Sequence, residues 1–512
     1  MHTILIANRG EIAVRIIRAC RDLGVRAVAV FSECDRGALH VRLADEAHAI
    51  GGNPAADSYL RIDRLIDVAR RAGADAVHPG YGFLAENAAF AAACRDAGLV
   101  FIGPSPEAMA LMGSKTTARD VAARAGVRVV PGSQTPIADD VPDAHVRAEA
   151  DRVGYPLLVK AVAGGGGKGM RAVAAPGDLL AAVTTARSEA RSAFGDAAVY
   201  FERRIERPRH VEVQLLVDRQ GTVMPFVERE CSMQRRHQKL IEETPSPAVS
   251  ADVREAMTAA AARIAREAGY TNAGTVEFLL DGEAFYFLEM NTRLQVEHPI
   301  TELMTGVDLV VAQVAIARGE RLALDPLRPL TPNGHAIECR VYAEDPDAGF
   351  LPSPGHLTHV QPPAGPGVRD DSGVVTGSDI PLFYDPLISK VAVWGGDRPA
   401  ALARMARALA EYDIRGVRTT ISFFRRMLQD VNFRNGNVDT TFVDRLLADG
   451  ASAVRSQGTE GEAEAVAALA VALQVTEAAS GDRGRRNGAS AIRPDGWTAR
   501  ARAEALREWP RA

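Results

Sequence analysis

The chain has 512 residues, 47% of them hydrophobic and 24% charged, which is enough material for about three or four domains. Its formal net charge of −5 argues against general nucleic-acid binding and against a polybasic membrane-binding surface. The five cysteines are scattered and form no CxxC pair, which argues against a zinc site and favours a reducing compartment. There is no signal-peptide pattern and no apolar run of the ~18 residues that span a membrane. We therefore expect a cytoplasmic globular protein.

The N-terminal part of the chain alternates short apolar strands with helices. This alternation predicts a doubly wound parallel sheet that is covered by helices on both faces. The turn after the first strand, Asn8-Arg9-Gly10, is not GxGxxG, so no dinucleotide site is predicted. Strands are expected at 4–7, 26–31, 76–78 and 100–102, and helices at 11–23, 60–72 and 87–97.

The pattern changes near Leu111, where longer segments of mixed polarity predict an α+β unit with a mainly antiparallel sheet. A Pro- and Gly-rich region follows from Asn333 and contains a helix at 399–412. The chain ends in an Ala- and Glu-rich tail, which is either helical or disordered. In the middle unit we expect helices at 115–125 and 253–268, and strands at 156–161, 170–173, 199–201, 210–217, 223–230, 273–280 and 284–290.

The distribution of lysine is uneven. Only five of the 60 basic residues are lysines: Lys115, Lys160, Lys168, Lys239 and Lys390. Either GC-rich codon usage left these five, or they mark places where a compact ammonium is needed and a planar guanidinium does not fit. We favour function, because Lys160 and Lys168 lie before and inside a glycine run and Lys239 lies in a polar cluster.

The glycine run at 164–167, followed by Lys168, comes after an apolar strand that ends near Lys160. Glycines let backbone N–H groups approach an anion closely, so this loop could close over phosphates; the alternative is a flexible loop. Neither lysine is followed by Ser or Thr, which excludes a P-loop. Together with the upstream lysine, the loop indicates a nucleotide site.

Two carboxylates, Glu277 and Glu289, each lie in an apolar strand, and a short turn at 281–283 joins these strands. Two buried carboxylates close together repel each other unless a cation or hydrogen bonds neutralise them. Glu277 and Glu289, together with Asn291, therefore predict a Mg²⁺ site. The alternative is that both carboxylates lie on a side of the strands that faces solvent. Just downstream, the planar fork of Arg293 suits a carboxylate or bicarbonate, and Glu297 is a candidate general base if its pKa is raised.

The segment 231–239 holds several potential hydrogen-bond donors around His237 and Lys239. It is either a phosphate-binding segment or an ordinary basic loop. Cys231 at its start is better interpreted as a buried structural thiol than as a nucleophile.

Eight sequence blocks together point to a family. They are IANRGEIAVRIIRAC (6–20), HPGYGFLAEN (78–87), MGSK (112–115), GGGGKGM (164–170), CSMQRRHQK (231–239), EMNTRLQVEHP (289–299), HAIECRVYAEDP (335–346) and FLPSPG (350–355). In this order, from residue 3 to residue 447, they resemble the biotin carboxylase branch of the ATP-grasp enzymes.

The resemblance implies a mixed α/β and α+β protein of three domains. These are a doubly wound pre-ATP-grasp domain at 1–112, an ATP-grasp domain at 113–330 with a mobile glycine-rich lid at 131–204, and a biotin carboxylase C-terminal domain at 331–447. Residues 448–512 would be an extension that binds partners or is disordered. Lys390 lies in a matching stretch but has no implied role.

The activity implied is ATP-dependent carboxylation of biotin by bicarbonate through carboxyphosphate, as the first half-reaction of an acetyl- or propionyl-CoA type carboxylase. It implies ATP, Mg²⁺ or Mn²⁺, bicarbonate, and biotin carried by another chain, since no Met-Lys-Met sequence for biotin attachment is present. The implied partners are a biotin carboxyl carrier protein and carboxyltransferase subunits, with no nucleic acid and no membrane. A homodimer would use the counterparts Arg15, Arg18 and Arg369.

The resemblance also implies roles for individual residues. Glu297 would deprotonate bicarbonate, and Arg340 would stabilise negative charge on the biotin ureido oxygen. The catalytic set is Arg293, Glu297, Arg340 and Lys239, and the metal ligands are Glu277, Glu289 and Asn291. Bicarbonate and biotin would contact Lys239, Arg293, Gln295, Val296 and Arg340. ATP would contact Lys115, Lys160, Gly166, Gly167, Glu202, Arg203, Arg204, Ile205, His210, Gln234, His237, Glu277 and Glu289.

Two positions depart from the family pattern: Ala163, where many members have glycine, and Lys168, where many have arginine. Neither change removes an implied catalytic group. Two other functions stay open at this point, namely another ATP-grasp ligase that joins a carboxylate to an amine, and an inactive homologue that assembles partner subunits. Urea and pyruvate also stay open as final acceptors, because the transferase chooses the acceptor.

Overall fold

In the computed structural model, which describes residues 1–133, 135–162, 170–325 and 327–448, the N-terminal segments form a five-stranded parallel sheet in the order β3-β2-β1-β4-β5. Along β1, Ile4 and Ile6 enter one hydrophobic core and Leu5 enters another, so the sheet is buried on both faces. The predicted doubly wound sheet is confirmed, with β3 as an additional strand. The strands are β1 (Thr3–Ile6), β2 (Arg26–Ser32), β3 (Glu46–Gly51), β4 (Ala76–His78) and β5 (Val100–Phe101).

Helices cover both faces of this sheet. Ile16 and Cys20 of α1 lie in the core with Ile4, whereas Leu65 of α3 and Phe90 of α4 lie in the core on the other face. The helices are α1 (Gly10–Asp22), α2 (Leu39–Leu43), α3 (Ile62–Arg71), α4 (Ala88–Asp96) and α5 (Pro106–Gly113), with short 3₁₀ turns at Glu33–Asp35 and Ala55–Asp57.

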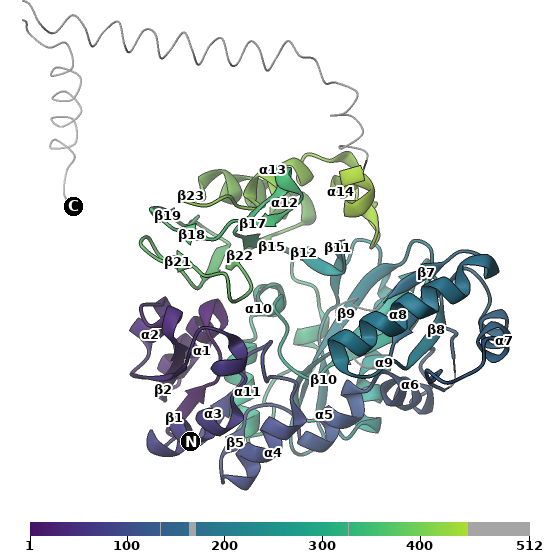
Figure 1. The fold of residues 1–512 in the computed structure, drawn as a ribbon. Helices are drawn as coiled ribbons and strands as arrows, with labels where there is room; N and C mark the ends of the chain where they lie inside the picture. The colour runs from purple at the N-terminus through teal and green to yellow at the C-terminus, as the bar shows by residue number, and fades with distance from the viewer. Residues whose placement is uncertain (134, 163–169, 326, 449–512) are drawn as a thin grey trace, which may run out of the picture. The chain divides into compact units, whose positions relative to one another are not determined.

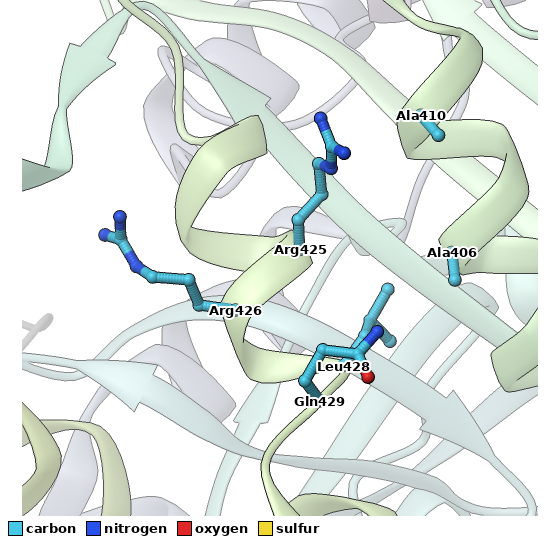
Figure 2. Close-up of a pocket in the computed structure, with 6 residues that line it drawn as sticks. All are labelled: Ala406, Ala410, Arg425, Arg426, Leu428 and Gln429. Carbon is cyan, nitrogen blue, oxygen red and sulfur yellow. The ribbon is translucent and has the colours of Figure 1, made fainter.

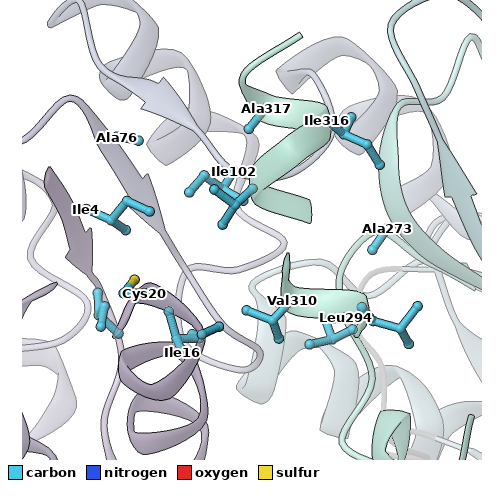
Figure 3. Close-up of a cluster of buried hydrophobic side chains, with 14 of the residues drawn as sticks. Ile4, Ile16, Cys20, Ala76, Ile102, Ala273, Leu294, Val310, Ile316 and Ala317 are labelled. Carbon is cyan, nitrogen blue, oxygen red and sulfur yellow. The ribbon is translucent and has the colours of Figure 1, made fainter. Parts of the chain in front are cut away.

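The core that contains Ile16 and Cys20 of α1 joins the N-terminal sheet to later parts of the chain (Figure 3). Ile16 packs in the same cluster as Val310 of α11 (Leu309–Ala317) and Ala273 of β13 (Asn272–Asp281). This shared core fixes the N-terminal sheet against the elements that carry the candidate site. Burial of apolar side chains is the main favourable contribution to the stability of such a core.

A small antiparallel sheet in the order β7-β6-β8 forms a separate layer with its own core (Figure 1). Val159 and Phe201 of the sheet pack with Val183 of α8 and Val146 of α7. Of the predicted lid glycines, Gly166 and Gly167 lie outside the described residues. The elements are α7 (Asp143–Val153), β6 (Leu157–Ala161), β7 (Arg171–Val173), a 3₁₀ turn (Pro176–Asp178), α8 (Leu179–Phe194) and β8 (Val199–Arg203).

The largest sheet among the described residues has nine antiparallel strands, in the order β14-β13-β9-β11-β12-β15-β22-β20, with β10 also paired to the end of β9. The predicted single strand at 223–230 is wrong, because the chain leaves β10 at Pro225 and enters β11 at Arg229. The strands are β9 (Arg209–Val217), β10 (Val223–Pro225), β11 (Arg229–Arg235), β12 (Gln238–Thr244), β13 (Asn272–Asp281), β14 (Ala284–Asn291), β15 (His335–Tyr342), β20 (Val368–Ser372) and β22 (Leu387–Gly395).

This sheet continues from the central region of the chain into the C-terminal region. β12 pairs with β15, so that Glu242 lies opposite Glu338, and β15 pairs in turn with β22. Three two-stranded sheets complete the C-terminal region: β16 (Glu344–Asp345) with β17 (Leu351–Pro352), β18 (Gly355–His356) with β21 (Asp379–Ile380), and β19 (His359–Gln361) with β23 (Asp413–Arg415).

Helices pack on the large sheet from several parts of the chain. They are α6 (Lys115–Arg124), α9 (Ala251–Glu267), α10 (His298–Thr305), α11 and α12 (Arg398–Glu411). α13 (Ile421–Met427) packs against α12, and α14 (Val431–Arg434) follows it in the chain; 3₁₀ turns lie at Arg328–Leu330 and Pro346–Ala348. Within the described residues, no single helix is long and apolar enough to cross a membrane; α10 and α11 reach that composition only as a pair bent by 95°. The helices expected in the tail lie outside the described residues.

Candidate active site

Lys239 lies at the centre of a buried group of carboxylates that three separate elements supply. Its Nζ atom is 2.6 Å from Oε2 of Glu212 on β9, 2.9 Å from Oε1 of Glu277 on β13, and 2.8 Å from Oε1 of Glu297, which precedes α10. Burial opposes a charge on Lys239, but the surrounding anions hold the pKa of its ammonium well above the usual value. The segment 231–239 is therefore not an ordinary basic loop, because it forms β11, a tight turn and the start of β12.

Glu277 has polar contacts at both of its carboxylate oxygens. Nε2 of His210 lies 2.9 Å from its Oε2 atom, and the side-chain amides of Asn291 and Gln295 donate to its Oε1 atom at 2.9 and 3.1 Å. Burial would raise the pKa of Glu277, but Lys239 and His210 hold it far below the usual range. Because Glu277 is only 4% exposed, the solvent-facing alternative for this strand is excluded.

The second predicted metal ligand has different surroundings. Glu289 lies directly opposite Glu277 in the register of β13 and β14, yet no described side chain donates a hydrogen bond to it. Burial and the nearby Glu277 raise the pKa of Glu289. A divalent cation between two such carboxylates would remove this repulsion, and oxygen ligands suit Mg²⁺, so the residues present fit the ion.

A second set of possible ligand atoms, from His210, Glu212 and Glu277, comes close enough together to hold a metal. The Lys239 ammonium already lies within ion-pair distance of both carboxylates of this set. A cation placed there would be repelled by Lys239. We therefore favour the position between Glu277 and Glu289.

Arg340 of β15 approaches Glu297 from the opposite side to complete the charged cluster. Its Nη2 atom lies 2.9 Å from Oε2 of Glu297 and 2.6 Å from Oε1 of Glu242, while its buried Nε–H has no hydrogen-bond partner among the described residues. Burial would raise the pKa of Glu297, but Lys239 and Arg340 hold it well below the usual range. The condition of a raised pKa is therefore not met in this arrangement, in which the two cations keep Glu297 ionised.

Arg293 follows β14 and is held from three sides. Its Nε donates to Glu86 at 3.0 Å, Nη1 to Oε1 of Gln295 at 2.9 Å, and Nη2 to Oδ1 of Asn291 at 3.2 Å. Glu86 also accepts the backbone N–H of Thr292 at 2.9 Å. The N-terminal domain thereby orients this guanidinium.

The predicted phosphate ligands lie on the neighbouring elements. Lys160 on β6 is ion-paired with Glu202 on β8, which places a predicted phosphate ligand against the segment predicted to contact adenine. Lys115 begins α6, and burial lowers its pKa although Glu289 and Glu202 act in the other direction. Lys160 therefore lies beside Glu202, a predicted nucleotide contact, and Lys115 lies near Glu289, a predicted metal ligand.

The turn between β11 and β12 presents His237, which has a left-handed backbone with φ +67°. Burial, with the nearby Lys160 and His210, lowers the pKa of His237 and favours the neutral ring. Gln234 lies opposite Lys239 in the register of these strands. The remaining predicted adenine contacts, Arg203, Arg204 and Ile205, follow directly at the end of β8.

Three functional candidates were missed from the sequence: Glu86, Glu212 and Arg229. Arg229 is fully buried and its Nε lies 2.6 Å from Oε1 of Glu212. Glu212 interrupts the apolar strand HVEVQLLV in the same way that Glu277 interrupts its own strand, so the same signal was present. Glu86 lies in a quoted sequence block, but its partner Arg293 is 207 residues away.

Two of the arginines predicted at a dimer contact are engaged within this chain. Arg15 and Arg369 pair with opposite oxygens of Glu302, at 2.9 and 2.6 Å, and Arg15 is only 6% exposed. Arg18 is exposed. Of the three, Arg18 is thus the side chain best placed to reach another molecule.

A pocket on the C-terminal region lies between α12 and α13 and contains none of the predicted site residues (Figure 2). It is lined by Ala406, Ala410, Arg425, Arg426, Leu428 and Gln429. The candidate active site is instead formed by the strands of the large sheet and the turn before α10.

Comparisons with known proteins agree with this arrangement. Residues 1–109 match the family "Biotin carboxylase, N-terminal domain", residues 114–325 match "Carbamoyl-phosphate synthase L chain, ATP binding domain", and residues 338–445 match "Biotin carboxylase C-terminal domain". The chain is 53% identical to a biotin carboxylase of Nostoc over 444 residues, which cover 86% of this chain and 98% of that protein. It is also 53% identical to a pyruvate carboxylase subunit from Methanothermobacter thermautotrophicus, over 86% of this chain and 89% of that protein.

Solved structures extend the likeness to the fold. A biotin carboxylase of Campylobacter jejuni in complex with β,γ-ATP superimposes with a TM-score of 0.83 at 45% identity, over 86% of this chain and 98% of that chain. The biotin carboxylase domain dimer of 2-oxoglutarate carboxylase from Hydrogenobacter thermophilus, bound to MgADP, ADP and bicarbonate, gives the same TM-score and identity over 86% and 97%. With three matching domains in order and 53% identity over 86% of its length to a named biotin carboxylase, the chain belongs to the biotin carboxylase family.

Proposed function

We propose that this ATP-dependent biotin carboxylase performs the first half-reaction of an acetyl- or propionyl-CoA type carboxylase, on biotin carried by another chain. The observation that carries the proposal is the position of Glu297 between two cations, with Lys239 at 2.8 Å and Arg340 at 2.9 Å. In such an arrangement the cations can bind a small anion, and the carboxylate between them lies next to that anion as a base. Activation of bicarbonate requires both.

Bicarbonate binds where these groups converge. Lys239 and the guanidinium of Arg293 supply the positive charge, while Gln295 and the Val296 backbone supply further hydrogen bonds. As bicarbonate enters, it separates Glu297 from its cations, so the carboxylate regains the basicity to accept the bicarbonate proton. The resulting anion attacks the γ-phosphoryl group of ATP to form carboxyphosphate.

The ATP-contacting residues form the other side of the same site. Lys115, Lys160 and His237 contact the phosphates, and Gly166 and Gly167 close over them. Adenine lies against Glu202, Arg203, Arg204 and Ile205, with His210 and Gln234 beside the ribose and phosphates. Lys160 exchanges Glu202 for phosphate oxygens when the nucleotide binds, and this exchange costs little because one charge-assisted contact replaces another.

The metal ligands in this proposal are Glu277, Glu289 and Asn291, which would hold Mg²⁺ or Mn²⁺. The ion, when bound, neutralises charge on the phosphates during transfer. The protein positions its own ligands in advance, since Asn291 already donates to Glu277 at 2.9 Å.

Arg340 completes the reaction at biotin. Breakdown of carboxyphosphate gives CO₂ and phosphate, and phosphate removes the proton from biotin N1′. The guanidinium of Arg340 stabilises the negative charge that develops on the ureido oxygen. Its buried Nε–H, which has no hydrogen-bond partner among the described residues, is a further donor at this site.

The final acceptor, the carrier and the transferase are part of the proposal. Relatives include proteins named for pyruvate and for methylcrotonoyl-CoA, so acceptor choice within the family varies with the partner chains. We assign a homodimer or a larger carboxylase complex, with Arg18 as an exposed contact. A cytoplasmic location is consistent with five cysteines that are all unpaired.

The test is ADP release by purified protein with Mg²⁺-ATP, in CO₂-free buffer and after addition of bicarbonate, with and without high free biotin. Bicarbonate-dependent release that rises with biotin is the expected result. Release that depends on bicarbonate but ignores free biotin would point to a requirement for the carrier or to another acceptor. No release under any condition would favour an inactive scaffold, and release driven by an amine would favour a different ATP-grasp ligase.

A further inference from the structure

Lys390 on β22 is a completely buried cation, 0% exposed, to which the chemistry proposed above gives no task. Its nearest counter-ion is Glu11 at the start of α1, whose Oε2 atom lies 3.1 Å from Nζ, and Oδ2 of Asp371 on β20 lies 4.0 Å from Nζ. A buried ammonium is costly unless it is paired and hydrogen-bonded, so its other contacts indicate why it is there.

Lys390 donates a hydrogen bond of 3.0 Å to the backbone carbonyl of Val296. This carbonyl and the N–H of Glu297 belong to one planar peptide group, so fixing the oxygen fixes the direction in which the backbone enters Glu297. Nζ also lies 3.4 Å from the hydroxyl of Tyr81, with the Tyr81 ring centroid 5.5 Å away.

The preceding carbonyl in the same turn is held too. Nδ1 of His298 lies 2.8 Å from the carbonyl oxygen of Gln295, and His298 is fully buried. Two successive carbonyls of the segment 295–297 therefore bond to buried polar groups that lie outside the anion-binding cluster. The side-chain contacts of Glu297, by contrast, must rearrange when an anion enters between Lys239 and Arg340.

We infer that Lys390, with Glu11 as its counter-ion, is a positioning residue that holds the 295–297 turn in the geometry needed to bind and deprotonate bicarbonate. This inference rests on the proposed function of the same site. It makes the N-terminal domain, through α1, a structural contributor to a site built on the large sheet. Lys390 touches the backbone of the turn and none of the proposed substrate-binding side chains.

Substitution of Glu11 distinguishes two possible roles of Lys390: positioning of the 295–297 turn, and neutralisation of the Glu11 charge. Burial raises the pKa of Glu11 to about 7 although Lys390 acts in the opposite direction. A glutamine at position 11 therefore resembles the protonated carboxyl, and the double variant Glu11→Gln/Lys390→Met contains no unpaired buried charge at this pair.

The experiment measures the bicarbonate KM, the ATP KM and kcat from ADP release, together with the thermal denaturation midpoint, for wild type, Lys390→Met and the double variant. Loss of a charge-assisted hydrogen bond predicts a bicarbonate KM about tenfold or more above wild type, with the ATP KM unchanged. The double variant is expected to regain thermal stability but to keep the raised bicarbonate KM. If Lys390→Met does not fold, the double variant carries the test.

Arg254→Met is the matched control, because Arg254 pairs at 2.6 Å with the buried Glu228 and does not contact the turn. It is expected to lower the denaturation midpoint with the bicarbonate KM unchanged. A wild-type bicarbonate KM in either Lys390 variant would overturn the inference. Absence of bicarbonate-dependent ADP release by the wild type would instead overturn the proposed function and this inference with it.

Discussion

Glu277 on β13 and Glu289 on β14 lie directly opposite each other across an antiparallel strand pair. Directly opposed side chains lie on the same face of a sheet, and like charges in such a pair destabilise it. The surroundings of the two carboxylates differ, because Glu277 is neutralised by Lys239 and His210 whereas burial and Glu277 raise the pKa of Glu289. Glu289 is therefore the member of the pair that most needs an added cation.

Glu289→Gln is expected to weaken Mg²⁺-nucleotide binding about tenfold, since one anionic oxygen ligand becomes a neutral amide. The denaturation midpoint should stay the same or rise, because a half-buried charge that is repelled by Glu277 is removed. Calorimetric titration of ADP at several Mg²⁺ concentrations measures the binding. The matched control is Glu283→Gln in the exposed β13–β14 turn. An unchanged Mg²⁺ dependence in Glu289→Gln would remove Glu289 from the metal site.

Arg340→Ala is expected to lower biotin carboxylation more than about a hundredfold, since it removes the cation that stabilises the ureido oxygenate. Some bicarbonate-dependent ADP release should remain, because the ATP-binding residues lie on other elements. The measurement compares ADP release with and without free biotin. Arg425→Ala, on an exposed arginine beside the pocket in Figure 2, is the control. Loss of nucleotide binding in Arg340→Ala would contradict the assigned role.

The elements that sequence periodicity predicted best are those whose pattern is local. The predicted helix at 11–23 is α1 at Gly10–Asp22, and the predicted helix at 253–268 is α9 at Ala251–Glu267. The break between β10 and β11 was not predicted, because residues 226–228 include the apolar pair Phe226-Val227 and carry no turn signal. Local pattern likewise does not specify that β12 pairs with β15, since that contact joins distant parts of the chain.

In the candidate site, too, local sequence patterns predicted some features, whereas contacts between distant parts of the chain were not predicted. Glu277 was identified because a charged residue interrupts an apolar strand, and the structure places it against Lys239. The orientation of Arg293 by Glu86 depends on a contact over 207 positions, which no spacing rule contains. The direction of the Glu297 pKa shift could not be predicted from the sequence, because it depends on cations from β12 and β15 that only the folded sheet brings together.

A variant that ends at Leu447 is expected to carboxylate free biotin within about twofold of the full chain, because all of the charged cluster lies in residues 1–445, which form one compact unit. If the extension at 448–512 binds partners rather than being disordered, binding to the carrier or transferase subunits is expected to weaken. ADP release and partner pull-down from defined, purified subunits measure these two effects. Loss of free-biotin activity in the shortened chain would show that the extension supports the catalytic core.

Acid should destabilise the fold partly through His40, which is fully buried beside the carbonyl of Val30. Burial lowers the pKa of His40 from its ordinary value of 6.5 to about 4, so between these values the unfolded chain binds a proton that the folded chain does not. This contribution to stability is complete above pH 6.5 and is lost as the pH falls towards 4. His40→Gln should therefore reduce the pH dependence of the unfolding free energy by up to ~1.4 kcal/mol per pH unit in this window.

Thermal denaturation midpoints at pH 7, 6 and 5 compare the wild type with His40→Gln and with the control His145→Gln, which replaces an exposed histidine on α7. The His40 variant should have the lower midpoint at pH 7, where the wild type gains most from its neutral buried ring, and the difference should narrow at pH 5. The His145 variant should follow the wild type at all three values. Parallel curves for wild type and His40→Gln would mean that His40 accepts its proton equally well in the folded protein, and the acid sensitivity would then have to come from other buried groups.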